Sequence, residues 1–376
     1  GRKTFAILQR GDSLLQLGIQ LGTAHAAHSS AGGRGKMQIE REPPGQDDLA
    51  VKHLDGAGWG NAQLSKDILG AFFQVGIIAG IDGGGTKTEC VLMNLKGEVI
   101  SKSLFGSLNM NSRPVAEMAE SMRGVIERVR AQGGICRMLC VGCAGMSNPE
   151  LRRTLERMIR ADGYEGAYML AGDQAAALYA AHGAGPGAVL ISGTGSICFG
   201  RNTRGITARA GGRGYKIDDE GSGYAIGRDI LSAVVRAQDG RSRPTVLTEL
   251  VFAQIGTRNL DELIRALYTE GDKRGNLSTY ALLLPEAVAQ GDAAACAILE
   301  RTVRELCLLA STVIERLELQ RGRLALSGGV LKNDAYVTEG VKAQLGELYP
   351  ELESFLLATS AATGAARMAL AAVQEN

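Results

Sequence analysis

The sequence lacks any apolar run of about 18 residues, the length that a membrane-spanning helix requires, so we expect no membrane span. Cysteine is sparse, and seven is an odd number in a chain of 376 residues, which argues against a disulfide scaffold and favours a reducing compartment. Charge of one sign is not in excess either, because 41 basic and 40 acidic residues leave a formal net charge of +1. That balance argues against a dedicated nucleic-acid surface. We therefore expect a cytoplasmic protein with neither a nucleic-acid nor a membrane partner.

The composition is otherwise that of an ordinary globular protein, with 45% hydrophobic and 22% charged residues and enough length for two core-forming domains. No signal peptide is indicated, because Gln9 and Arg10 interrupt the first apolar stretch. Residues 1–76 differ from the rest: 24–30 are small and polar, and 42–48 resemble a linker. We find no motif there and expect an N-terminal extension of unknown role, with a composition that favours disorder.

A glycine-rich loop interrupts residues 77–94, whose sequence is IIAGIDGGGTKTECVLMN. The loop is not a P-loop, because Lys87 follows Thr86 where that motif requires a glycine. It is not a dinucleotide fingerprint either, because Thr88 stands where the third glycine would be. The apolar residues before and after it, with a turn and a further strand up to residue 100, predict a hairpin. Glycines in such a loop let backbone N–H groups approach an anion, although an ordinary tight turn is an equal alternative.

A second loop of the same kind lies in residues 188–202, whose sequence is AVLISGTGSICFGRN. The pattern is strand, loop at 192–196, strand, turn and strand again at 206–208, which repeats the order of the first half. An internal duplication is the natural inference. Two hairpin loops that face each other across a cleft could hold a polyphosphate from both sides.

A third element follows late in the chain, where 324–330 predicts a buried strand that ends in Gly328 and Gly329. Glycines at that end leave room for a flat ligand such as an adenine ring. The helix before this strand presents one apolar face: Leu299, Val303, Leu306, Ala310, Val313 and Leu317. A helix at 115–129 is expected to pack the first half through Val115, Met118, Met122, Val125, Ile126 and Val129. A last helix opens at 363–366 and is expected to return to the first half.

With these three elements in this order, the sequence resembles the superfamily of acetate and sugar kinases, heat-shock ATPases and actin. Within it, the chain resembles the N-acetylglucosamine kinases and the BadF-type ATPase family from about residue 78 to its end. The most specific motifs are SGTGSICFGRN and, at 211–229, GGRGYKIDDEGSGYAIGRD. The chain is similar in particular to bacterial kinases that act on N-acetylmuramic acid and N-acetylglucosamine.

The resemblance implies an α/β fold of two duplicated ribonuclease-H-like lobes, 77–185 and 186–376, with mixed sheets flanked by helices around a nucleotide cleft. It implies ATP and Mg²⁺ as cofactors, phosphoryl transfer to a hydroxyl of an amino sugar, and a homodimer. Asp82 would orient the metal. The other nucleotide contacts would come from Gly84, Gly85, Thr86 and Lys87, from Ser192, Gly193, Thr194, Gly195 and Ser196, and from Gly328 and Gly329 near adenosine.

The resemblance also implies a catalytic base, Asp173, in MLAGDQAAALYAA. This aspartate stands at a strand-to-helix corner, where a helix N-cap is the alternative role. A carboxylate within hydrogen-bond reach of the sugar hydroxyl would accept its proton during transfer. Besides Asp173, the sugar contacts would come from Asn109, Gly145, Gly212, Arg213 and Asp219.

Two positions depart from the family pattern, which commonly has Gly-Gly-Trp-Gly-His before Gly-Asp-Glu-Gly-Ser. Here Arg213 replaces the aromatic residue, and Asp218 replaces a glycine. Because a guanidinium can hold a carboxylate bidentately, Arg213 could engage the lactyl carboxylate of a muramic-type sugar. The alternative is a solvent-facing Arg213 paired with Asp218. The sequence does not determine which amino sugar, or which of its hydroxyls, is the acceptor.

The spacing of Cys136, Cys140 and Cys143 matches an iron–sulfur motif of radical enzymes. The run predicts a strand, however, with Cys136 and Cys140 on one face and Cys143 on the other, so we favour small buried apolar residues. Two other functions stay open in the same superfamily: an ATPase activator, and a sugar sensor without kinase activity. A DNA-binding sensor would need a helix-turn-helix, and residues 1–76 show none.

Overall fold

The computed structural model divides the chain into two units, Gly1–Val75 and Gly76–Asn376. In the first unit it describes the backbone of four short strands, of which β1 (Ala6–Arg10) pairs with β2 (Ser13–Leu17) and β3 (Met37–Glu40) with β4 (Ala50–His53). In the second unit it describes all residues except Thr86, 109–113, Gly134, Ser147, 270–273 and Asn376, and of 274–276 only the backbone.

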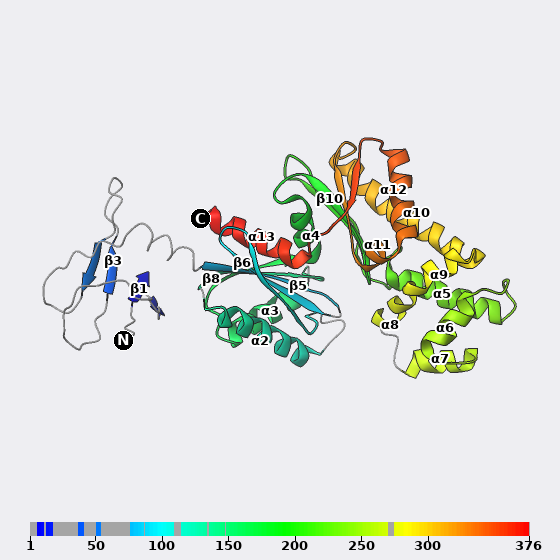
Figure 1. The fold of residues 1–376 in the computed structure, drawn as a ribbon, viewed down its shortest axis with the longest axis horizontal. Coiled ribbons are helices and arrows are strands. Elements are labelled where there is room, and N and C mark those ends of the chain that lie inside the picture. The colour runs from blue at the N-terminus through cyan, green and yellow to red at the C-terminus, as the bar shows by residue number, and fades with distance from the viewer. Residues whose placement is uncertain are drawn as a thin grey trace. The chain divides into compact units, whose positions relative to one another are not determined.

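The first half of the second unit is built on a five-stranded mixed sheet in the order β7-β6-β5-β8-β9. The strands β5 (Gly76–Gly83), β6 (Thr88–Asn94) and β7 (Val99–Phe105) form an antiparallel meander, and β8 (Ile135–Cys143) and β9 (Ala167–Gly172) run parallel to β5. The central strand β5 is apolar on both sides because helices cover both faces of the sheet. Figure 1 shows α2 (Val115–Ala131) and α3 (Pro149–Ala161) on one face and α13 (Ala361–Gln374) with α4 (Asp173–His182) on the other.

The second half repeats this order in a second five-stranded sheet, β12-β11-β10-β13-β14. Here β10 (Gly187–Ser192), β11 (Ser196–Arg201) and β12 (Thr207–Gly211) form the meander, and β13 (Arg323–Ser327) and β14 (Glu353–Leu356) run parallel to β10. The predicted α/β fold with two mixed sheets flanked by helices is therefore confirmed, and the matching strand orders support the inferred duplication.

The second half also carries most of the helices that the structure describes. Besides α10 (Ala293–Leu317), which packs along the second sheet, these are α5 (Gly223–Gln238), α6 (Leu247–Ile255), α7 (Leu260–Thr269), α8 (Arg274–Thr279), the 3₁₀ turn Tyr280–Leu283, α9 (Leu284–Ala289), α11 (Gly329–Asn333) and α12 (Ala335–Leu348). Among the described residues no single helix is long and apolar enough to cross a membrane. One helix pair, Leu277–Ala289 and Ala293–Leu317, reaches that length and apolar composition only when its two helices are taken together, and it is bent by 118° at the break.

Helix α13 follows the second sheet in sequence but packs on the first. Its residues Ala362 and Ala366 contact β5 at Gly80, where a Cβ would collide with their backbone atoms. Its Gly364 lies against α4, where a Cβ would collide with the backbone of Ala176. Helix α4 in turn contributes to the cores of both halves, through Ala176 on one side and Leu178 on the other. The two sheets are thus joined through a pair of helices that pack at backbone distance.

Two expectations about packing are wrong. Cys136 lies on the same face as Cys143, and Cys140 lies on the opposite one, because a bulge at Arg137 shifts the register of β8 by one residue against β5. The three thiols therefore do not converge, and among the described residues no three His, Cys, Asp or Glu side chains form a group that could hold a metal. Val115 is 49% exposed, because it begins α2 and projects beyond the buried stripe of that helix.

Candidate active site

Two carboxylates meet at one edge of the first sheet. Asp82 is near the end of β5, and Asp173 follows β9 directly, so the parallel strands carry both to the same side. Between them stands Gly142 of β8, which pairs with Asp82, and an added Cβ there would lie 4.0 Å from the Asp173 Cα. Burial, together with the charge of Asp173, raises the pKa of Asp82 to about 7, while the charges of Lys332 and Lys87 oppose this rise.

Asp173 is the first residue of α4, and the N-cap of this helix is Gly172. The helix-cap role considered for Asp173 is therefore wrong. Its Oδ1 accepts a hydrogen bond of 2.9 Å from the backbone N–H of Gln174, at the positive end of the helix dipole. The carboxylate is thus held at the start of a helix that both halves of the molecule pack against.

The first glycine loop closes on itself. The Gly84 N–H donates to the Lys87 carbonyl at 3.0 Å, and the Ser107 hydroxyl donates to the Gly84 carbonyl at 2.9 Å. Gly85 is half-buried and Lys87 is exposed, whereas Thr86 lies outside the described residues. The hydroxyl of Thr88, just after the loop, is buried and has no partner among the described residues. Thr88 was not among the site residues predicted from sequence, and its side chain is fully buried.

The second glycine loop is anchored by its two serines. Both are buried; the Ser192 hydroxyl donates to the Gly221 carbonyl at 2.7 Å and the Ser196 hydroxyl to the Glu220 carbonyl at 2.6 Å. Their hydroxyl protons are therefore used inside the protein. The loop's remaining donors, the N–H groups of Thr194 and Gly195 and the Thr194 hydroxyl, have no partner among the described residues.

Gly328 and Gly329 lie beside this second loop. Gly328 has φ of +95°, and a Cβ there would collide with the Ser192 carbonyl, so only glycine fits. An added Cβ on Gly193 would meet only the Gly329 nitrogen, at 3.9 Å. One turn further along α11, Lys332 acts on Asp82 by its charge, which brings a basic group of the second half to the carboxylates of the first.

The end of β12 and the loop after it are shaped by glycines with positive φ, Gly211 in the strand and Gly212 and Gly214 in the loop. Arg209 of β12 donates from Nη2 to the Gly211 carbonyl at 2.9 Å and to the Gly212 carbonyl at 2.7 Å, while its buried Nε has no partner among the described residues. Burial and the nearby charge of Arg213 lower the pKa of Arg209, and the charges of Asp173 and Asp218 oppose this. Arg209, like Lys332, was not predicted from sequence. It bonds to the loop after β12, and its charge interacts with that of Asp173.

The other expected sugar contacts fall in different places. Arg213 is exposed. Its backbone N–H donates a hydrogen bond of 2.9 Å to Oδ2 of Asp218. Asp219 is buried with φ of +68°, and its Oδ1 lies 3.5 Å from the Ser196 N–H, so it reaches the second glycine loop. Gly145 stands in the exposed turn after β8, at the sheet edge of Asp82. Asn109 lies outside the described residues.

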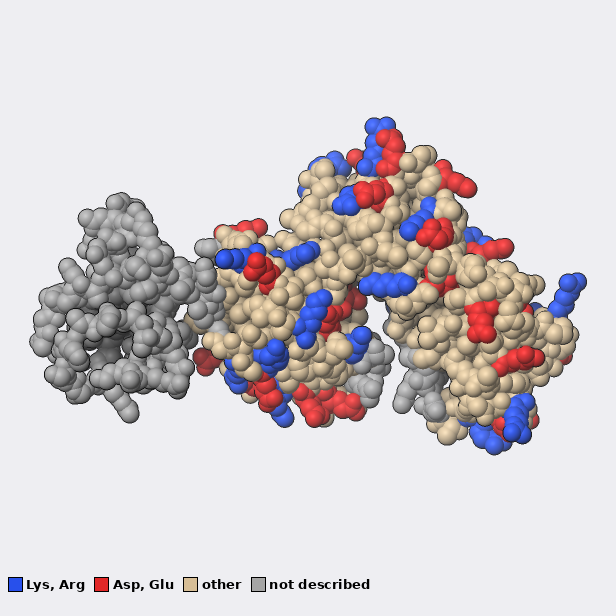
Figure 2. Space-filling view, in the orientation of Figure 1, with Lys and Arg blue, Asp and Glu red and all other residues tan. Residues whose placement is uncertain are grey.

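These groups can serve a nucleotide with Mg²⁺. The metal is commonly bound by one or two carboxylates with phosphate oxygens and water completing the shell. Asp82 fits that role, since it is half-buried beside a second carboxylate and a cation would relieve their repulsion. Figure 2 shows the molecular surface hollowed between the part built on the first sheet and the part built on the second, with basic and acidic side chains on its walls.

The comparisons with known proteins agree with this fold. Residues 79–369 match the model of the BadF/BadG/BcrA/BcrD ATPase family, and the chain belongs to that family. Over 294 residues it is 32% identical to an N-acetylmuramic acid/N-acetylglucosamine kinase of Clostridium acetobutylicum, covering 77% of this chain and 96% of the relative. Over 313 residues it is 29% identical to an N-acetyl-D-glucosamine kinase of Dictyostelium discoideum, covering 78% and 98%. A solved Chromobacterium violaceum structure, proposed to be an N-acetylglucosamine kinase, has the same fold with a TM-score of 0.65 at 24% identity, covering 80% of this chain and 99% of that one.

Proposed function

We propose that the protein is an ATP-dependent kinase that phosphorylates a hydroxyl group of an amino sugar of the N-acetylglucosamine and N-acetylmuramic acid class. Family membership and the names of the two curated relatives support this reading. The observation that carries it is the pair Asp82 and Asp173 at one sheet edge, within the fields of Lys332 and Arg209 from the other half. Phosphoryl transfer to a hydroxyl is accelerated by a carboxylate that accepts the hydroxyl proton and by metal ions and cations that neutralise charge on the phosphates.

In the proposed mechanism, the backbone N–H groups of Thr194 and Gly195 bind phosphate oxygens of ATP, opposite the first glycine loop. Asp82 holds Mg²⁺, which when bound neutralises charge on the phosphates. Asp173 positions the sugar hydroxyl and accepts its proton. That carboxylate stands in the first turn of α4, at the positive end of the helix dipole, and its charge also acts on Arg209. Closure of the two halves over the sugar would exclude water.

The sugar specificity is proposed to depend on Arg213. Arg213 is exposed in the loop after β12, and its charge is close enough to Arg209 to lower the pKa of Arg209. A carboxylate substituent on the sugar would relieve the repulsion between the two guanidinium groups and could be held by two hydrogen bonds. We therefore propose that an acid-bearing amino sugar of the muramic type is preferred over a neutral one.

The test is release of ADP from ATP·Mg²⁺ in the presence of N-acetylglucosamine, N-acetylmuramic acid, glucosamine or glucose. Stimulation by one amino sugar, together with a phosphorylated product, supports the proposal. Turnover at the background rate with all four sugars contradicts it and favours the ATPase activator or the sugar sensor. The proposal includes a homodimer, which sedimentation of the purified chain would test.

A further inference from the structure

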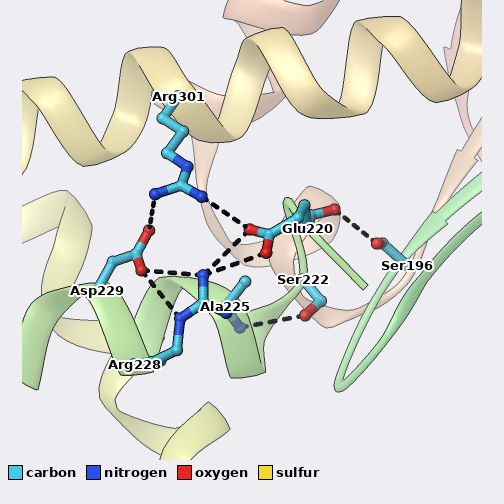
Figure 3. Close-up of polar contacts among 7 residues, drawn as sticks. All are labelled: Ser196, Glu220, Ser222, Ala225, Arg228, Asp229 and Arg301. Carbon is cyan, nitrogen blue, oxygen red and sulfur yellow. Dashed lines mark hydrogen bonds and ion pairs between the residues drawn. The ribbon is translucent and has the colours of Figure 1, made fainter. Parts of the chain in front are cut away.

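Four charged side chains form a closed ring between α5, α10 and the loop before α5 (Figure 3). The Glu220 carboxylate accepts from Arg228 Nη2 at 3.1 and 3.3 Å and from Arg301 Nη2 at 3.4 Å. The Asp229 carboxylate accepts from Arg228 Nε at 3.1 Å, and its Oδ2 lies 3.5 Å from Arg301 Nη1. Positive and negative groups alternate around the ring, so each carboxylate contacts both guanidinium groups.

This ring differs from an isolated surface ion pair. The Asp229 and Glu220 side chains are only 19% and 34% exposed, so solvent screens their charges less than those of an open pair. Arg301 is also far from the others in sequence and comes from α10, whereas Arg228 and Asp229 lie in the second turn of α5. The ring therefore fixes Glu220 relative to two helices.

The side chain of Glu220 contacts the two arginines, whereas its backbone contacts the loop 192–196. Its carbonyl accepts the Ser196 hydroxyl, and the next carbonyl, of Gly221, accepts the Ser192 hydroxyl. Figure 3 shows Glu220 between Arg301 on α10 and Ser196 on the glycine loop. Both ends of the loop 192–196 are thus hydrogen-bonded to the backbone of Glu220 and Gly221, and the side chain of Glu220 belongs to the charged ring.

The first turn of α5 fastens the middle of the same loop. The Gly223 N–H donates to the Gly193 carbonyl at 2.8 Å and the Tyr224 N–H to the Thr194 carbonyl at 3.3 Å. These bonds direct the carbonyls of the loop toward α5, and they leave the Thr194 and Gly195 N–H groups as the donors for a ligand. The direction of those donors therefore depends on the position of the segment 220–224.

We infer that Arg301 and Asp229, acting through Glu220, are positioning residues for the phosphate-binding loop 192–196. The inference rests on the proposed function only in taking the ligand of this loop to be a phosphate of ATP. Without Arg301, Arg228 is the one arginine of the ring that still contacts the two carboxylates. The segment 220–224 and the loop 192–196 bonded to it should then become more mobile. Small displacements of donors aimed at a reacting phosphate are costly, because the geometry of the bound phosphate must be held closely.

The test is equilibrium binding of ATP·Mg²⁺, ADP and adenosine, without sugar, to the full chain and its variants. Arg301→Gln and Asp229→Asn are each expected to weaken ATP and ADP binding by about tenfold while adenosine binding changes by less than about twofold. Because both variants open the same ring, the double variant should be little weaker than either single one. Arg301→Lys, which keeps the charge, should recover part of the affinity. Arg304→Gln is the matched control, since Arg304 is exposed on the same helix, and its nucleotide binding should equal that of the parent.

Equal weakening of adenosine and ATP, or unchanged binding in both Arg301→Gln and Asp229→Asn, would overturn the inference and leave the ring as a tie between α5 and α10. Thermal unfolding of each variant identifies any that fails to fold, and the remaining variants then decide. If the parent binds ATP but phosphorylates no sugar, the proposed function is contradicted. The inference about Arg301 and Asp229 is then still decided by nucleotide binding to the variants. A parent that binds no nucleotide contradicts both. In the active enzyme, Arg301→Gln should raise the KM for ATP and leave that for the sugar unchanged.

Discussion

Asp82 and Asp173 lie so close at the edge of the first sheet that the charge of Asp173 adds to burial in raising the pKa of Asp82 to about 7. The strand between them carries Gly142, where a Cβ would come within 3.1 Å of the Ala176 Cβ and 3.3 Å of the Ile81 carbonyl. The missing side chain lets α4 begin directly beside β5. Two carboxylates that repel each other in this way are stabilised by a cation or by a proton shared with a substrate hydroxyl.

The first prediction concerns Asp173. Asp173→Asn keeps the size of the side chain but removes its ability to accept a proton, so kcat should fall by about a thousandfold. Binding of ATP, measured by calorimetry, should change little, because the glycine loops are left intact. Asp261→Asn is the control, since Asp261 also lies in the first turn of a helix and is exposed. A kcat within about tenfold of the parent would show that Asp173 is not the base.

Much of the fold could be predicted from sequence because its signals are local. Apolar strands that end in glycine-rich loops, at 77–94 and again at 188–202, gave both meanders. The helix around Met122 and the strand before Gly328 followed from their periodicity. The matching strand order of the two sheets then followed from the repeated pattern.

The parts that could not be predicted depend on long-range packing. Arg209 and Lys332 reach the carboxylates only because the second half folds against the first, and neither belongs to a motif. The serines of the second loop match a phosphate-binding motif, yet their hydroxyls are taken by carbonyls about 25 residues later. The bulge that turns Cys136 to the other face of β8 leaves no signal in a residue pattern read with period two.

The second prediction concerns the contact between α13 and α4. Gly364→Ala adds a Cβ that collides with the Ala176 backbone and comes within 2.8 Å of the Ala180 Cβ. Alanine improves helix propensity by about 0.8 kcal/mol, but overpacking costs about 1–3 kcal/mol, so the variant should be less stable in urea unfolding. Gly346→Ala is the matched control in α12, where a Cβ would meet no atom within 4 Å, and it should be slightly more stable than the parent. Equal effects of the two substitutions would contradict a destabilising contact at Gly364.

The third prediction concerns His182, at the end of α4. Its ring packs edge-on against Phe355 at 6.0 Å, and its Nε2 lies 2.9 Å from the Ala188 carbonyl. Burial lowers the pKa of His182, so the folded protein favours the neutral ring and the unfolded chain takes up the proton first as pH falls below 6.5. The unfolding temperature of the parent should therefore fall more steeply below pH 6.5 than that of His182→Gln, with no such difference at higher pH. Parallel curves would contradict this, since the other three histidines are common to both proteins.

The fourth prediction concerns sugar choice. Arg213→Gln removes an exposed guanidinium beside Arg209, so the KM for N-acetylmuramic acid should rise by about tenfold, the value of a charge-assisted hydrogen bond pair partly open to water. The KM for N-acetylglucosamine, which has no carboxylate, should stay within about twofold. Lys216→Gln is the control, because it removes one positive charge from another exposed position of the same loop. It distinguishes a specific contact of Arg213 with the sugar carboxylate from attraction by the net charge of the loop. If both variants weaken the acidic sugar equally, the loop attracts it only by net charge; if neither does, Arg213 has no part in its recognition.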